Sequence, residues 1–218
     1  MATTYLNLVN DVLARLREPS VASVTENDYS ALIGKLVNDA KREVEDAWNW
    51  ECLRSTITVS TSASTSGYTL TGSGDRFRFE QVYNDTSDYS LEAGTTTAFN
   101  DALLLTATPK SDEPTMYNIN GVDSSGDLLV RLYPIPDATY SVKFSGFKPE
   151  AELSSGTDTT KLSKQAIVAL AWAKAIEERG EDGGVNVSSQ YAVAKQALAD
   201  AIAIEAGRRE DEITWYWT

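Results

Sequence analysis

The sequence predicts an α+β fold, in which a four-helix bundle is built from the N- and C-terminal segments and an antiparallel β-sandwich or barrel is inserted between them. Two observations support this prediction. Residues 1–53 are rich in helix formers, residues 54–150 in Ser, Thr, Tyr and Gly, and residues 161–209 in Ala, Glu and Lys. Apolar residues recur with a helical period in the outer regions and alternate in the middle one. The expected domains are 1–53 (helical, first half), 54–153 (inserted β domain), 154–209 (helical, second half) and 210–218 (extended C-terminal docking tail).

Two amphipathic helices are predicted in the first region. The first covers residues 3–17 and ends before Pro19, because the residue that precedes a proline is disfavoured in helical geometry. The second covers residues 28–51, and Thr25 or Asn27 can cap its N-terminus. In both, apolar residues recur at i, i+3 and i+4, which places them on one face. The first helix carries Tyr5, Leu8, Val9, Val12, Leu13 and Leu16, and the second carries Tyr29, Leu32, Ile33, Leu36, Val37, Ala40, Val44, Ala47 and Trp48.

Short strands are predicted in the middle region, where apolar and polar residues alternate. Residues 124–127 connect two of them as a hairpin. Pro134 ends a strand, because proline has no N–H to donate to the next one. Two interpretations are kept for residues 91–105, a strand extension at 95–97 and a helical turn at 100–105. The predicted strands are 55–60, 68–70, 77–83, 115–120, 128–133 and 140–147.

Two more helices are predicted after the β region. The third runs to Arg179, with Ser163 or Thr160 as its N-cap and Gly180 at its end. Its apolar residues cover more than one face, so it should lie centrally among the helices. The fourth covers residues 188–208. No single helix can bury its apolar stripe alone, so all four are expected to pack together.

An aromatic segment closes the sequence. A charged stretch at 208–212 is followed by three adjacent aromatic residues, whereas chain ends are usually polar. Trp and Tyr dominate the energetics of protein–protein interfaces. We therefore predict that the tail docks on a partner protein, with folding back onto its own helices as the alternative. The proposed docking residues are Ile213, Trp215, Tyr216 and Trp217.

The charge balance and the missing residue types narrow the possible functions. The net charge is −13, which disfavours conventional DNA binding. The chain has no histidine, the commonest general base and metal ligand. The single cysteine, Cys52, is expected to be a small buried hydrophobe beside Trp50. We expect no membrane span and no secretory signal.

No motif in the sequence indicates catalysis, a cofactor or a metal. The acidic groups at 177–178, 181–182 and 210–212 lie at predicted helix ends or in exposed connections, without the convergence that a catalytic pair of carboxylates needs. Residues 123–127 lack the ligand spacing of a calcium loop and are better explained as a turn. Basic and aromatic residues alternate at 77–79, but a strand with one solvated face explains this better than binding of single-stranded nucleic acid.

Several passages together resemble the head-to-tail adaptor family of tailed phages, which includes tail tubular protein A. They are 48–56, 77–85, 132–140, 169–173 and 177–180, and they follow the family's order over nearly the whole chain. The resemblance implies a virion structural protein with no catalytic residue. It implies a ring, commonly a dodecamer, that lies beneath the portal protein and continues the DNA channel used in genome packaging and DNA ejection.

The same resemblance implies that the helical part faces the portal and that the β part meets the tail nozzle and fibres. The protein would assemble in the host cytoplasm and reside at the head–tail interface of the virion. DNA would pass without specific binding. A separate hypothesis, drawn from the net charge and not from the resemblance, is that acidic residues face the channel and offer few contacts to phosphates. The alternatives are another tail or neck component, such as a nozzle protein, or a carbohydrate-binding β module or carboxylate hydrolase.

Overall fold

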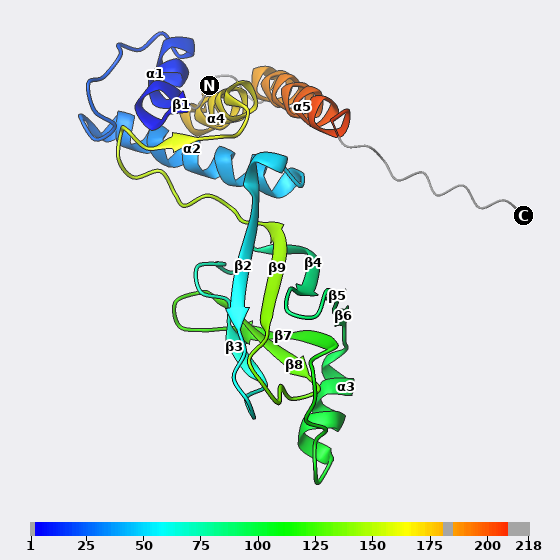
Figure 1. Ribbon diagram of the computed structural model, residues 1–218. Coiled ribbons are helices and arrows are strands. Elements are labelled where there is room, and N and C mark those ends of the chain that lie inside the picture. The colour runs from blue at the N-terminus through cyan, green and yellow to red at the C-terminus, as the bar shows by residue number, and fades with distance from the viewer. Residues whose placement is uncertain (1–2, 181–184, 209–218) are drawn as a thin grey trace, which may run out of the picture. The chain divides into compact units, whose positions relative to one another are not determined.

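The four long helices lie toward the two ends of the chain, and most strands lie between them, in the computed structural model, which describes residues 3–180 and 185–208 (Figure 1). The contacts divide the chain into two units. The helical unit comprises Met1–Cys52 with Glu150–Thr218, and the β unit comprises Leu53–Pro149. The predicted mixed helix-and-sheet class is confirmed.

The helical unit contains four long helices, and most of their predicted positions are confirmed. The second helix is shorter than predicted, because Trp48 leaves helical geometry and buried Trp50 donates its indole N–H to the carbonyl of Val44 at 2.7 Å. This contact satisfies a carbonyl in the last turn. The elements are β1 Thr3–Thr4, α1 Tyr5–Arg15, α2 Asp28–Ala47, β10 Thr159–Thr160, α4 Lys164–Arg179 and α5 Val185–Ala206.

Helix α4 is central to this unit, because it contacts α1, α2 and α5. Its buried residues lie on several sides, which agrees with the apolar pattern of its sequence. The Ser163 hydroxyl accepts the Ala166 N–H at its start, and Gly180 ends it in the left-handed conformation at φ 63°. Both predicted caps are confirmed. Strands β1 and β10 pair antiparallel ahead of α1 and α4.

The β unit contains two four-stranded sheets (Figure 1). One has the order β2-β9-β4-β5 and the other β3-β8-β7-β6. All pairs are antiparallel except β6 with β7, which is parallel and differs from the expected pattern. The bounds are β2 Arg54–Ser60, β3 Gly67–Thr69, β4 Arg78–Asn84, β5 Tyr89–Ser90, β6 Glu92–Ala93, β7 Met116–Val122, β8 Leu128–Tyr133 and β9 Ser141–Phe147.

Both sheets contribute side chains to one hydrophobic core. The turn between β7 and β8 is the predicted hairpin, and the Asp123 carboxylate accepts the N–H groups of Ser125 and Asp127 within it. The carboxylate of Asp127 accepts from Gly72 and Gly74 and so joins this turn to the one after β3. The core consists of Val59, Leu70, Phe77, Val82, Leu91, Leu128, Val130, Leu132, Val142 and Phe144.

Residues 91–105, whose structure the sequence left undecided, are helical from Thr96 to Leu105. Helix α3 spans Thr96–Asn100, and the π-helical turn η2 spans Asp101–Leu105. The Thr95 hydroxyl accepts the Ala98 N–H at 3.2 Å and caps α3. Of the two alternatives left open by the sequence, the strand extension is therefore wrong and the helical turn is right.

Candidate assembly surfaces

The C-terminal end of α5 is anchored within the helical unit. Glu205 is buried, and its Oε1 accepts the backbone N–H of Glu51 at 2.7 Å. Its Oε2 lies 3.1 Å from Nη1 of Arg208. A carboxylate that accepts from both a main-chain N–H and a guanidinium forms strong, charge-assisted hydrogen bonds. The last described residues are therefore fixed to the turn that follows α2.

The predicted docking residues come after this anchored end. Ile213, Trp215, Tyr216 and Trp217 lie outside the residues that the structure describes. Their docking role stays a prediction.

A hollow of about 610 Å³ lies beside the anchored end. Its lining combines the α5 residues Ala201 and Ile204 with Trp50, Leu162 and Lys161. Ile204 is 62% exposed although it is apolar. This surface mixes apolar and charged groups, and the exposed Ile204 makes it a candidate contact surface.

Cys52 lies in the wall of the same hollow and is exposed, so the expectation that it is buried is wrong. In the short turn at 51–53 its neighbours Trp50 and Leu53 occupy the buried positions and leave Cys52 toward solvent. Partial desolvation, followed by the negative charges of Glu150 and Glu205, raises the pKa of the thiol. Little of the reactive thiolate is therefore present at neutral pH.

We expect iodoacetamide to alkylate Cys52 more slowly at pH 7.5 than it alkylates the same residue in the denatured chain. A raised pKa moves the appearance of thiolate to higher pH, so the rate should keep climbing above the pH at which the denatured chain reaches its plateau. Mass spectrometry of the alkylated fraction at several pH values measures both rates. Equal rates at pH 7.5 would contradict the raised pKa.

A second hollow of about 600 Å³ lies between α2, α4 and α5 and is largely apolar. Its walls include Val44, Leu170 and Leu198. The Tyr191 hydroxyl donates to Glu177 at 2.6 Å, and desolvation followed by this hydrogen bond raises the pKa of Tyr191 to about 12. The phenol therefore stays protonated at physiological pH, and Glu177 is engaged in a structural contact.

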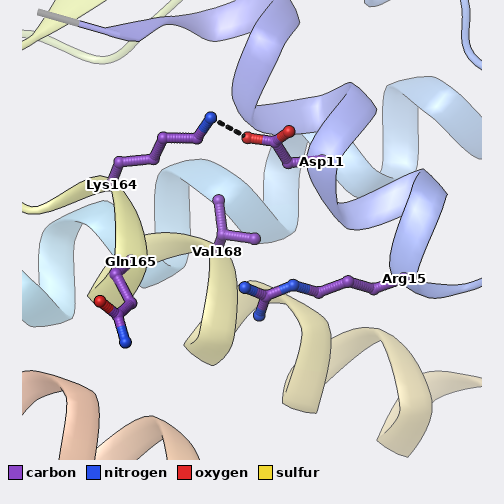
Figure 2. A pocket seen from close by; sticks show the side chains of 5 residues that line it. All are labelled: Asp11, Arg15, Lys164, Gln165 and Val168. Atoms are coloured by element: carbon purple, nitrogen blue, oxygen red, sulfur yellow. Dashed lines mark ion pairs between the residues drawn. The ribbon is translucent and has the colours of Figure 1, made fainter.

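A polar hollow of about 350 Å³ lies between α1 and α4 (Figure 2). Lys164 Nζ lies 2.5 Å from Asp11 Oδ2, and the Arg15 guanidinium stands over the Trp172 ring at 5.4 Å. Lys164 thus pairs with the carboxylate of Asp11 across this hollow, whereas Arg15 lies against Trp172, so each basic group already has a partner in the chain (Figure 2). The arrangement offers no nucleophile with an adjacent base and no pair of convergent carboxylates.

The most deeply buried charges are Lys41 and Glu45 on α2, 2% and 1% exposed. Lys41 Nζ donates to Glu45 Oε1 at 2.6 Å and to the carbonyls of Glu150 and Ala151 at 3.2 and 3.1 Å. The Glu150 N–H donates back to Glu45 at 3.1 Å. The pair therefore holds the chain where it returns to the helical unit, which is a structural role.

The Lys41–Glu45 pair was not among the residues predicted from the sequence. Lys41 and Glu45 are four residues apart and lie beside Ala40 and Val44 of the apolar stripe. Opposite charges at i, i+4 next to an apolar stripe are the signal that could have revealed a buried ion pair. Asn38 adds to the same contact, because its side-chain amide exchanges two hydrogen bonds with Leu153, at 2.9 and 3.0 Å.

Two other sequence candidates for chemistry, at 77–79 and 123–127, have structural roles in the β unit. Phe77 is buried, and Phe79 packs against the same core rather than forming a stacking surface. Residues 123–127 form a turn, and 181–182 and 210–212 lie outside the described residues.

Within 3–180 and 185–208, no group of three or more Cys, Asp or Glu side chains could hold a metal ion. No helix in these ranges is both long and apolar enough to span a bilayer.

A model of the family described as SU10 adaptor protein matches residues 3–216. The match covers the helical unit, the β unit and the tail as far as Tyr216. It defines the class of protein, because this family is one of structural phage proteins and not a family of enzymes. The chain belongs to the SU10 adaptor protein family, a phage head-to-tail adaptor family. A comparison with curated proteins finds no match.

The resemblance to head-to-tail adaptors is thereby confirmed. Membership in this family implies a place at the head–tail junction of the virion, in association with portal and tail.

Proposed function

We propose that this protein forms a ring beneath the portal, links the capsid to the tail nozzle and continues the DNA channel. The family match over residues 3–216 carries the proposal. A closed ring repeats one heterologous contact, so each subunit needs two different side faces. We propose twelve copies, the count that the resemblance implies. The hollows of the helical unit give it contact surfaces of different chemistry, one apolar and one polar.

In this proposal the helical unit acts as a four-helix bundle that meets the portal, and the β unit acts as a sandwich that meets the nozzle and fibres. The net charge of −13 suits a channel through which DNA slides, because acidic groups offer few contacts to phosphates. Assembly takes place in the host cytoplasm. Electron microscopy of the protein with its portal tests the ring, its copy number and the charge of its lumen.

We propose further that Ile213, Trp215, Tyr216 and Trp217 dock on the portal. Adjacent aromatic side chains can fill pockets at low entropic cost, and the anchored end of α5 gives the tail a fixed starting point. The charged stretch at 208–212 would act as a polar spacer between the helix and the docking residues.

Replacing Trp215, Tyr216 and Trp217 by Ser is expected to weaken portal binding at least tenfold, because truncated aromatic anchors each cost on the order of 2 kcal/mol. The matched control replaces Thr214 and Thr218 by Ser, in the same segment, and should leave binding unchanged. Binding is measured by pull-down with the portal and by biolayer interferometry. Equal affinity of the aromatic variant and the control would remove the docking role. Co-purification with tail components alone would favour a nozzle or neck protein instead.

A further inference from the structure

The β unit presents a leucine tip, Leu103–Leu105, at the end of the α3–η2 segment (Figure 1). Leu104 is 68% and Leu105 79% exposed, and Leu103 is half-buried. Between Thr95 and Pro109 the only charged residue is Asp101. Adjacent exposed leucines with so little charge around them are typical of a contact surface rather than of a solvated loop.

The base of the tip is fixed, so the leucines are held outward. Phe99 is 1% exposed, and its ring meets that of Tyr133 at a centroid distance of 6.2 Å. Arg131 Nη1 donates to Asn100 Oδ1 at 3.1 Å, and Asn118 Nδ2 donates to the carbonyl of Gly94 at 2.9 Å. These contacts hold α3 and the residues just before it on the sheet, so the leucines extend from a fixed base.

A second apolar surface, the β7 edge patch, consists of Ile119 and Val122. They are 43% and 49% exposed. Strand β6 pairs with Met116 and Tyr117 only, and within the described ranges no strand pairs with β7 beyond them on that side. The partners of Ile119 and Val122 on β8 are Val130 and Leu128, which belong to the core. The patch therefore continues the core to an open sheet edge.

The two surfaces lie on opposite faces of the same sheet. Asn118 and Arg131 are paired across β7 and β8, and both reach the α3 segment with their side chains. Ile119 follows Asn118 directly, and successive side chains of a strand point to opposite faces. The leucine tip and the β7 edge patch are thus separated by the sheet within one copy.

We propose that in the ring the leucine tip of one copy packs on the β7 edge patch of the next copy. The inference rests on the proposed ring. A second copy is the occupant that the structure favours, because each copy supplies two apolar surfaces on opposite faces of one sheet, which cannot cover each other. A tip on one copy and a patch on its neighbour make the heterologous contact that rotational symmetry requires.

Paired cysteines test the contact. In a Cys52→Ser background, which removes the only natural thiol, Leu105→Cys and Val122→Cys are placed in separate copies of different mass and mixed with portal. Oxidation should give a reducible heterodimer of the two kinds of copy, and the chain that carries both substitutions should give a ladder of oligomers. The control replaces Val122→Cys by Val193→Cys, on the 52% exposed Val193 of α5, and should give at most a tenth of the heterodimer.

Charge substitution provides the second test. Leu104→Asp combined with Leu105→Asp should reduce the ring fraction at least tenfold in mass photometry, while the circular dichroism and melting temperature of the subunit stay as they were. Val193→Asp serves as the control and should leave rings intact.

Rings that form with portal but show no heterodimer overturn the inference and leave the proposed function standing. A cross-link from Leu105→Cys to a nozzle protein instead of a neighbouring copy also overturns it. If the unchanged chain forms no ring with portal, both the proposed function and this contact are refuted.

Discussion

Replacing Lys41 by Met should lower the free energy of unfolding of the helical unit by about 3–5 kcal/mol, because it leaves the Glu45 carboxylate buried without its counter-ion. The same change removes the donors to the carbonyls of Glu150 and Ala151, at the point where the chain re-enters this unit. Chemical denaturation followed by circular dichroism at 222 nm measures the loss, since this signal comes chiefly from the helices.

Two further variants separate the buried charge from the shape of the side chain. Lys41→Met combined with Glu45→Leu removes both charges at similar volume and should recover much of the lost stability, because a buried ion pair contributes little over a well-packed apolar pair. Lys174→Met breaks the Lys174–Glu43 pair, in which the Glu43 side chain is 52% exposed, and should cost only about 0–1 kcal/mol. Equal losses for Lys41→Met and Lys174→Met would refute the role of the buried pair.

The parts of the fold that local chemistry determines could be predicted from the sequence. The start of α4 follows from a hydroxyl that accepts an N–H three residues on, and its end follows from a glycine free to adopt positive φ. The hairpin at 124–127 follows from turn-forming residues between two alternating runs. In each case the determining contact lies within a few residues of the element.

Features that depend on which side chains become buried, or on residues far away in sequence, were missed. The end of α2 is set by the Trp50 indole, and the exposure of Cys52 follows from which of its neighbours take the buried positions. The leucines at 103–105 fit a helical turn equally well whether buried or exposed, so their sequence could not reveal the tip. Glu205 lies within the predicted fourth helix, but its role depends on the backbone N–H of Glu51, far away in sequence.

The same distinction applies to function. An adaptor needs no constellation of catalytic groups, so the usual motifs were absent and the order of weak passages along the chain carried the family resemblance. Contact surfaces are defined by what the fold leaves uncovered. The hollows around α5 and the leucine tip therefore emerge only when the burial of each side chain is known.

Gly146→Ala is expected to destabilise the β unit near the top of the range of about 1–3 kcal/mol that overpacking costs. Gly146 lies on β9 between Ser55 of β2 and Phe79 of β4. The register of β4 shifts between Phe79 and Gln81, and a Cβ on Gly146 would overlap the carbonyl oxygen of Arg78. A backbone atom cannot rotate away as a side chain can, so the pairing of β4 with β9 has to open.

Gly67→Ala is the matched control, because Gly67 also lies in a strand but an added Cβ there meets no atom within 4 Å. It should leave stability unchanged or raise it by about 0.4–1 kcal/mol, through the reduced freedom of the unfolded chain. Denaturation followed by aromatic near-ultraviolet circular dichroism reports on both variants, since Phe77, Phe79 and Phe144 pack in this core. If Gly146→Ala unfolds at the same denaturant concentration as Gly67→Ala, the close approach of β4 to Gly146 does not constrain the strand pairing.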